Sequence, residues 1–584
     1  MGVIKIIRLL KNLSKYKLFL LIPISAMILG ITADMFLPRL TRILIDDVFT
    51  SNNHELLYPV ILSMLGIYIF RTISIYLKEF LFDKVGVNIM GDIKKDLFGH
   101  IQKMHFGYFD KKNTGELMAR IGEDVENIWF TLGFGLALFV ENIIYFVVAS
   151  TILFFLHWKL ALISLITMPF IAYLAIKLEK NIGKAFEEIS DQVAVMNTTA
   201  QENISGVRLV KAFSREKHEI NKFLEMNEKN YELNMKKTRI WAKYFPSIEF
   251  FGNISIVLVV VLGGMFVIND SLSLGTLVAF SQYIWMLIWP MRMLGWLTNA
   301  ISESKASAKK IHKIRDENPL INSGNEKTEN FDGHIIFENV SFKYSEDEEY
   351  VLKDINLNVK PGSTIAIMGE TGSGKSTLVN LIARYYDISE GKIIIDNKNI
   401  KDLKLDDLRK NISVVFQDNF LFSETVTENI KLGKPEGDLE EIINVSEKAC
   451  AHEFVKKLKK GYSTIIGERG IGLSGGQKQR LTIARSLMKD SKILIFDDAT
   501  SALDMETEFN LLKNISMNSK KITTFIIAHR ISAVKNADEI IFLDKGKIVE
   551  RGTHNDLISY EGKYYEIYMD QFKDFEGITE TEVM

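Results

Sequence analysis

The amino-acid sequence predicts two domains of different fold class: an all-α transmembrane domain with six spans, followed by an α/β domain of the phosphate-loop type. Long apolar runs dominate roughly the first 300 residues, and all six tryptophans lie before residue 297. The second half carries the run GETGSGKS directly after an apolar, strand-like segment. With 584 residues, the chain is also too long for a single hydrophobic core.

Six stretches of the first half are apolar enough to cross a bilayer, which takes roughly 20 helical residues each. They lie near residues 18–38, 57–77, 133–156, 160–177, 249–269 and 271–292. The long connections at about 80–130 and 178–244 are rich in Lys and Arg, and such connections stay on the cytoplasmic side. We therefore expect a multi-pass protein of the cell membrane with both chain ends in the cytoplasm.

The cytoplasmic parts of this half are expected to be helical. Residues 1–16 alternate apolar and basic side chains at helical spacing, which is typical of a helix lying on the membrane surface. Segment 178–244 keeps helical periodicity, so the spanning helices should continue into the cytosol. We expect Thr114–Ile128 and Ile204–Lys217, which mix charged and apolar residues, to contact the second domain.

Overall charge and cysteine content exclude several classes of protein. The net charge is −2, without a basic excess, so nothing suggests a nucleic-acid partner. Cys450 is the single cysteine, which excludes a disulfide framework and a cysteine metal site. We expect it to be a buried, unreactive thiol.

A polar segment at residues 313–333, broken by Pro319 and Gly324, is typical of a linker. Beyond it, apolar runs alternate with helical segments, which predicts a largely parallel sheet flanked by helices. These runs are Ile335–Tyr344, Ser363–Gly369 and Lys492–Asp498. The expected domains are a membrane-surface helix (1–16), a transmembrane domain (17–312), the linker (313–333), a nucleotide-binding domain (334–572) and a tail (573–584).

The run from Gly369 to Ser376 fits the phosphate-loop pattern in full, between a strand and a helix. Its backbone N–H groups should wrap the phosphates of ATP, with Lys375 on the outer phosphates and Ser376 on Mg²⁺. Asp497 ends an apolar strand, where its carboxylate can hold the same metal ion. The predicted phosphate-binding residues are Gly369, Glu370, Thr371, Gly372, Ser373, Gly374, Lys375, Ser376 and Thr377.

These motifs, together with LSGGQ at Leu473–Gln477 and SALD at Ser501–Asp504, resemble those of an ATP-binding cassette (ABC) exporter half-transporter. The resemblance covers essentially the whole chain. It implies an ATP-hydrolysing translocase that uses ATP and Mg²⁺ and works as a dimer in the lipid bilayer. It also implies an amphipathic compound, a lipid or a peptide as cargo.

The resemblance also implies roles for further residues. Tyr344 would stack on adenine, Gln417 would contact Mg²⁺ and the attacking water, and His529 would be the switch histidine. Glu468 would lie in a segment that touches the membrane domain, and SALD would cross the dimer interface. The signature residues that would contact the ATP of the opposite cassette are Ser474, Gly475, Gly476 and Gln477.

One position departs from the family pattern. The residue after the metal-binding aspartate is usually the glutamate that polarises the attacking water, and here it is Asp498. The side chain is one methylene shorter, and a displacement of about 1 Å can slow a reaction about 100-fold. The resemblance therefore favours a heterodimer with a weakly hydrolysing site on this chain. A slow homodimeric exporter and an ATP-gated channel or regulator are the alternatives.

Two ionisable residues, Arg71 and Glu141, interrupt apolar runs of the membrane half, where an ionisable group is expensive. Two interpretations remain open. The residues pair with each other, or they line the path of the cargo.

Overall fold

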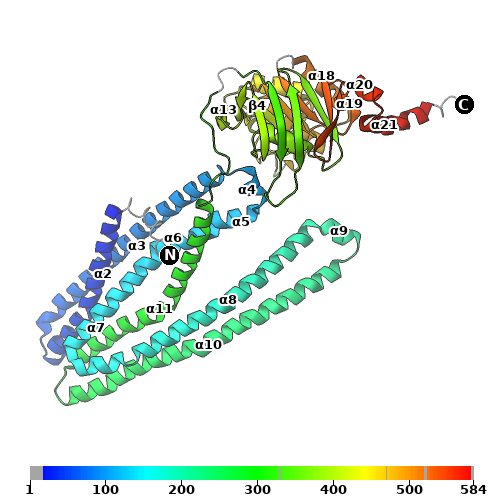
Figure 1. Ribbon diagram of the computed structural model, residues 1–584. Coiled ribbons are helices and arrows are strands. Elements are labelled where there is room, and N and C mark those ends of the chain that lie inside the picture. Colours follow the sequence, from blue (N-terminus) through cyan, green and yellow to red (C-terminus); the bar gives the residue numbers. More distant parts are fainter. Residues whose placement is uncertain (1–16, 328–330, 468–469, 519–521, 580–584) are drawn as a thin grey trace. The chain divides into compact units, whose positions relative to one another are not determined.

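The computed structural model of the protein describes residues 17–327, 331–467, 470–518 and 522–579 (Figure 1). They form two compact units, one holding the chain up to Lys103 together with Lys112–Asn318. The other unit holds Met104–Lys111 and the chain from Pro319 onward. The membrane-surface helix predicted at 1–16 lies outside the described residues.

The first unit is entirely helical among its described residues (Figure 1). Its α-helices are α2 (Lys17–Ile43), α3 (Leu57–Ile101), α5 (Thr114–Ala119), α6 (Val125–Phe130), α7 (Leu136–Leu165), α8 (Met168–Ser205), α9 (Val207–Ala212), α10 (Glu216–Ile268) and α11 (Leu274–Arg315). Short 3₁₀ or π turns join some of them at Leu44–Thr50, His54–Leu56, Arg120–Asp124 and Thr131–Gly135.

Five helical runs of the described residues are long and apolar enough to cross a membrane. They are Phe19–Thr50, His54–Ile101, Thr114–Leu165, Glu216–Ile268 and Leu274–Arg315. The span expected at 160–177 is not among them, because the helix is interrupted between Leu165 and Met168. A second break lies inside α7 at His157, whose backbone is extended (φ −163°, ψ 99°), so α7 is two helices that meet at this residue.

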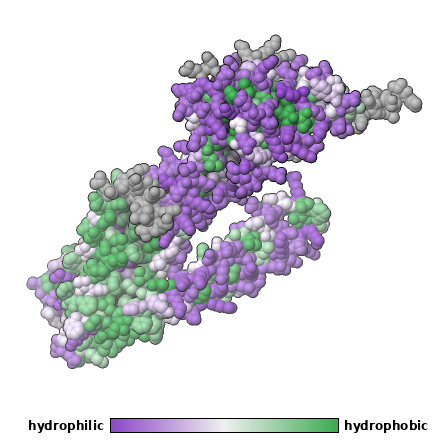
Figure 2. All heavy atoms as spheres, viewed as in Figure 1, coloured by the Kyte–Doolittle hydropathy of each residue, from purple (hydrophilic) through white to green (hydrophobic). Residues whose placement is uncertain are grey.

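Apolar residues gather over only part of these helices. In Figure 2 they cover α2, α3 and α7, whereas the distant halves of α8 and α10 towards α9 are mainly hydrophilic. A buried apolar cluster joins α2, α7, α8, α10 and α11, with Leu153, Leu160, Phe280 and Ile284 fully enclosed. The long helices therefore extend beyond their apolar parts, as the periodicity of 178–244 predicted.

Four charged residues of the apolar part form two separate pairs. Arg71 on α3 pairs with Asp34 on α2, and the Tyr145 hydroxyl donates to Asp34 Oδ2 at 2.5 Å. Lys78 on α3 donates to Glu141 on α7 at 2.9 Å. Of the two interpretations, the pairing of Arg71 with Glu141 is therefore wrong, because each side chain has a nearer partner of opposite charge.

The second unit contains two sheets. A four-stranded antiparallel sheet has the order β2-β1-β4-β5, and a six-stranded sheet has the order β10-β9-β3-β8-β7-β6. All neighbours in the larger sheet are parallel except β10 and β9. The strands are β1 (Ile335–Phe342), β2 (Leu352–Val359), β3 (Thr364–Gly369), β4 (Glu390–Ile395), β5 (Lys398–Asn399), β6 (Ile412–Val415), β7 (Ile493–Asp497), β8 (Thr523–Ile527), β9 (Glu539–Asp544) and β10 (Lys547–Gly552).

Helices pack against the six-stranded sheet. Those of this unit are α4 (Phe106–Asp110), α12 (Lys375–Ile382), α13 (Leu405–Lys410), α14 (Val426–Lys431), α15 (Leu439–Lys448), α16 (His452–Lys456), α17 (Gly475–Leu487), α18 (Met505–Asn518), α19 (Ile531–Val534), α20 (His554–Ser559) and α21 (Lys563–Thr579), with a 3₁₀ turn at Gly461–Ser463. Successive residues of β3 face opposite ways, as strand geometry requires. Ile365 and Ile367 join one hydrophobic core, and Ala366 and Met368 join the other.

The predicted fold class, an all-α membrane domain followed by an α/β phosphate-loop domain, is thus confirmed. The smaller antiparallel sheet was not anticipated.

Cys450 is half-buried, and burial raises the pKa of its thiol, so little reactive thiolate forms at neutral pH.

Replacing Asp34 tests whether its pair stabilises the helical unit. Asp34→Ala would leave Arg71 without its counter-charge and Tyr145 without its acceptor, and removing one partner of a buried pair costs about 3 kcal/mol. We expect a lower midpoint of thermal unfolding for the purified full chain in detergent. The exposed carboxylate of Asp47 provides the control, because Asp47→Ala should leave the midpoint unchanged. Equal effects of the two substitutions would contradict the assignment.

Candidate functional site

The phosphate loop follows β3 and ends in α12. Gly369 and Gly374 have φ values of +142° and +102°, in the region that favours glycine. A Cβ on Gly369 would lie 2.1 Å from the Leu543 carbonyl oxygen, so no other residue fits there. Lys375 Nζ donates to the carbonyl oxygens of Gly369 and Glu370 at 2.9 and 2.8 Å, and the ammonium group therefore lies over the loop.

Three observations test whether this loop suits an anion. The first turn of α12 has no side-chain cap, so its N–H groups point into the loop at the positive end of the helix. A Cβ on Gly372 would meet no atom within 4 Å, so the loop is open at that point. The buried hydroxyl of Ser373 has no hydrogen-bond partner among the described residues. The loop therefore fits a phosphate group.

The two predicted metal ligands, Ser376 and Asp497, lie together. Ser376 Oγ donates to Asp497 Oδ1 at 2.8 Å, although the residues are 121 positions apart. Burial raises the pKa of the Asp497 carboxyl, and the bond from Ser376 opposes that rise. Two oxygen ligands beside a phosphate-binding loop are the donors that Mg²⁺ prefers. The residues present therefore fit this metal ion.

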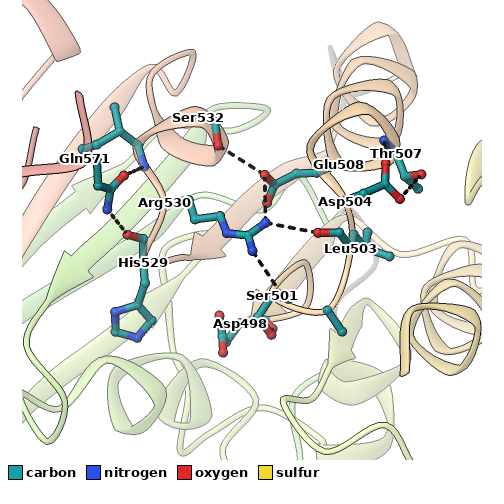
Figure 3. Close-up of polar contacts among 12 residues, drawn as sticks. Asp498, Ser501, Leu503, Asp504, Thr507, Glu508, His529, Arg530, Ser532 and Gln571 are labelled. Atoms are coloured by element: carbon teal, nitrogen blue, oxygen red, sulfur yellow. Dashed lines mark hydrogen bonds and ion pairs between the residues drawn. The ribbon is translucent and has the colours of Figure 1, made fainter. Parts of the chain in front are cut away.

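The remaining predicted catalytic residues follow the ends of neighbouring parallel strands. Val415 of β6 pairs with Phe496 of β7, and Asp497 of β7 pairs with Ile527 of β8. Asp498 comes directly after β7, and Gln417 and His529 each lie two residues beyond the ends of β6 and β8. All three are on the edge where the phosphate loop leaves β3. In Figure 3, the Asp498 carboxylate and the His529 imidazole lie on the same side of Arg530.

Asp498 has an unusual backbone conformation. Its φ is +49°, in the left-handed region that aspartate adopts more readily than most residues. Its N–H donates to the Ile527 carbonyl at 3.1 Å, and its own carbonyl accepts from the Ser501 hydroxyl at 3.0 Å. The backbone therefore turns sharply between β7 and the SALD loop. The two hydrogen bonds fix the backbone of Asp498, from which the short carboxylate projects.

Tyr344 lies near the phosphate loop. Its hydroxyl is 2.8 Å from Thr377 Oγ1, and its ring makes edge contacts with Phe342 and Tyr386. The residue is 41% exposed, which leaves room for a stacking partner. Desolvation raises the pKa of its phenol, which stays neutral at physiological pH.

The signature segment begins helix α17. Ser474 and Gln477 form a reciprocal capping box, in which Ser474 Oγ accepts from the Gln477 N–H and Gln477 Oε1 accepts from the Ser474 N–H. A Cβ on Gly476 would lie 3.0 Å from the Ala502 carbonyl oxygen, so the SALD loop packs against this turn. Ser474 and Gly475 are exposed, and their surface is open to another molecule. Glu468 lies outside the described residues.

Sequence reasoning missed the contact between α4 and the nucleotide-binding domain. The Phe106 ring stacks on Tyr385 with centroids 4.2 Å apart, and the Tyr386 hydroxyl donates to Asp110 Oδ2 at 2.7 Å. The available signals were the aromatic run at 106–109 and the paired tyrosines after α12. The segment Thr114–Ile128, which we expected to contact the second domain, packs within the helical unit through its own contacts, and its contact with a nucleotide-binding domain stays a prediction.

That packing is specific. Ser307 Oγ of α11 donates to Asp124 Oδ1 at 2.6 Å, and Arg120 donates to Asp124 Oδ2 at 2.6 Å. In the second expected segment, the short helix α9 joins α8 to α10, with Leu209 and Phe213 exposed. Its contact with a nucleotide-binding domain stays a prediction.

Comparisons with known proteins agree with this arrangement. Residues 19–291 match the family model of the ABC transporter transmembrane region, and residues 352–501 match the family model named ABC transporter. The chain is 36% identical to the uncharacterized ABC transporter ATP-binding protein YknU of Bacillus subtilis, over 95% of both chains. It is also 36% identical to the ATP-dependent lipid A-core flippase of Syntrophus aciditrophicus, over 91% of this chain and 88% of that one.

Among solved structures, a bacterial Atm1-family ABC exporter with ATP bound superposes with a TM-score of 0.82. The match has 26% sequence identity and covers 95% of this chain and 99% of that one. The phosphate loop, the Ser376–Asp497 pair and the six-stranded sheet follow a helical unit in one chain, and the two family models match these two parts in the same order. The protein therefore belongs to the ABC transporter family, as a half-transporter with a multi-pass membrane domain and one ATP-hydrolysing domain that drives transport.

Proposed function

We propose that the protein is one subunit of an exporter that moves an amphipathic compound, a lipid or a peptide out of the cytoplasm by alternating access. The observation that carries the proposal is the Ser376–Asp497 pair beside an uncapped phosphate loop, in the same chain as membrane-crossing helices. The names of relatives support the cargo class, since they include a lipid A-core flippase and a multidrug export protein of Bacillus subtilis. The basic connections support a cytoplasmic nucleotide-binding domain.

In this proposal, the loop and α12 bind the phosphates of ATP, and Lys375 turns from its carbonyl partners to the outer phosphates. Ser376, Asp497 and Gln417 would hold Mg²⁺, which when bound would neutralise charge on the phosphates. Tyr344 stacks on adenine. His529 and Asp498 orient the water that attacks the outermost phosphorus.

We also propose the domain boundaries predicted from the sequence, with a linker at 313–333 between the transmembrane domain and the nucleotide-binding domain.

The partner is a second half-transporter, and we propose a heterodimer. Hydrolysis needs the signature of the opposite chain, and the exposed Ser474 and Gly475 support such a contact. With Asp498, this chain's own site binds ATP but hydrolyses it slowly, because the carboxylate is retracted by one methylene. A partner with glutamate at that position would work against this chain's intact signature.

Asp498 also favours a second candidate function, an ATP-gated channel or regulator. A site that retains ATP without rapid hydrolysis would keep two subunits together for a long time. The two functions differ in energetics, because an exporter accumulates cargo against a gradient and a channel dissipates the gradient.

Transport in inside-out membrane vesicles tests the main proposal. We expect ATP-dependent uptake of a fluorescent amphipathic dye against its gradient, and Lys375→Ala should abolish it. The substitution removes a charge-assisted contact with phosphate, so nucleotide affinity should fall about tenfold or more. Binding of a fluorescent ATP analogue checks that loss. Flux that only runs down the gradient would support the channel instead.

Restoring the longer carboxylate tests the role of Asp498. Asp498→Glu should speed hydrolysis at this site about 10- to 100-fold, because the carboxylate regains its reach towards the water. Phosphate release from full-length protein measures the rate, and Asp498→Asn, which removes the charge at similar size, should be no faster than the wild type. The left-handed backbone suits aspartate better than glutamate, so a slightly lower unfolding midpoint is expected for the faster variant. An unchanged rate would refute the explanation by side-chain length.

Purification of the chain alone distinguishes heterodimer from homodimer. We expect slow hydrolysis by the isolated chain and a large increase on co-expression with a half-transporter that carries glutamate after its metal-binding aspartate. The mass of the complex with bound ATP, together with the rate, provides the readout. A stable dimer of this chain alone that turns over at about 10 s⁻¹, an ordinary enzymatic rate, would exclude the heterodimer.

A further inference from the structure

Gln571, on the C-terminal helix α21, makes two hydrogen bonds to the loop that carries His529. Gln571 Nε2 donates to the His529 carbonyl oxygen at 2.7 Å, and the Ile531 N–H donates to Gln571 Oε1 at 2.9 Å (Figure 3). The single side-chain amide therefore binds the residues on either side of Arg530. Both bonds go to backbone, so they restrain the course of the chain directly after β8.

The second bond serves as a helix cap. Helix α19 begins at Ile531, and its N-cap residue, Arg530, makes no side-chain cap hydrogen bond. The first N–H groups of a helix lack partners within it. Gln571 satisfies one of them from 40 positions away, which ties the start of α19 and the end of the His529 loop to α21.

Helix α21 is well anchored at its own start. Tyr564 is fully buried, and its hydroxyl lies 2.6 Å from His554 Nδ1. The N–H groups of Lys563 and Tyr564 donate to the Glu550 carboxylate at 2.6 and 3.1 Å. Gln571 lies about two turns further along this helix. It therefore acts from a supported position.

The loop that Gln571 grips also reaches the SALD loop. Arg530 Nη1 donates to the Leu503 carbonyl at 3.1 Å and lies 3.9 Å from the buried Glu508 carboxylate. Glu508 accepts from the Ser532 hydroxyl at 3.2 Å. Figure 3 shows these contacts in one group, with Asp498 at the far side of Ser501. The position of the His529 loop is thus linked to the loop that follows Asp498.

We infer that Gln571 is a positioning residue for ATP hydrolysis, through which α21 sets the place of the His529 imidazole beside Asp498. The inference rests on the proposed role of His529 at this site. His529 is exposed and lies on a loop, so its imidazole depends on the backbone for orientation. Without Gln571, the His529 carbonyl and the Ile531 N–H lose these partners, and the loop gains freedom next to the reacting phosphate.

Single-turnover conversion of radiolabelled ATP by the full-length protein in lipid nanodiscs, with its partner chain where hydrolysis requires one, tests the inference. Gln571→Ala should slow conversion about tenfold, since a displacement of about 1 Å can cost about 100-fold and the loop moves by less. Affinity for a fluorescent ATP analogue should change less than twofold. Gln571→Glu should also be slow, because its carboxylate cannot donate to the His529 carbonyl.

Two comparisons separate positioning from general stability. In a His529→Ala background, Gln571→Ala should cause no further loss, because it acts through the imidazole. Glu566→Ala, an exposed position of the same helix, should match the wild type. An equal further loss in the His529→Ala background, a wild-type rate in Gln571→Ala, or a loss of ATP affinity that matches the loss of rate would each overturn the inference.

The proposed function fails by a different result. The proposed function is refuted if the wild-type protein does not hydrolyse ATP, or if its hydrolysis persists in Lys375→Ala. Wild-type hydrolysis together with unimpaired Gln571→Ala would overturn only the role of Gln571.

Discussion

The parallel alignment of β3, β8, β7 and β6 is the constraint on which the nucleotide site depends. The register pairs Ile367 with Ile527, and Asp497 with Ile527, so β7 and β8 end at one level and β3 runs two residues further. The loops that follow them carry the phosphate cradle, His529, Asp498 and Gln417. A shift of one residue in the register would separate Ser376 from Asp497 and would move each strand's side chains to the opposite face of the sheet, into the wrong core. Two hydrophobic cores, one on each face of the sheet, hold that register.

The loops at this edge differ in how they are supported. The phosphate loop is held by its own helix and by close contact with backbone, as at Gly369. The loop with His529 is hydrogen-bonded to Gln571 of the distant helix α21, and its Arg530 donates to the Leu503 carbonyl of the SALD loop. The binding part of the site is thus locally built, whereas the part assigned to hydrolysis depends on several segments. This division suits a protein that must bind ATP in one state and hydrolyse it in another.

The helical unit contains charged side chains among apolar residues, and each of them needs a partner of opposite charge. Asp34 is shared by Arg71 and Tyr145, and Glu141 is matched by Lys78, so the buried charges are neutralised in pairs across α2, α3 and α7. Such pairing reduces the cost of each ionisable group at membrane depth. It also links three helices at points where apolar packing alone has little directional preference.

The sequence by itself determined the order of the two domains, the phosphate loop and the strand that ends at Asp497, because local patterns encode these features. Apolar run length, glycine spacing and the end of a strand need no knowledge of distant contacts. Only the tertiary structure decided which charges pair in the helical unit, and why 160–177 is not one continuous helix. It also revealed that Tyr386 contacts Asp110, 276 positions away, and that Gln571 holds His529, 42 positions away. No local spacing encodes such pairs, because they form only when packing of the whole unit brings the segments together.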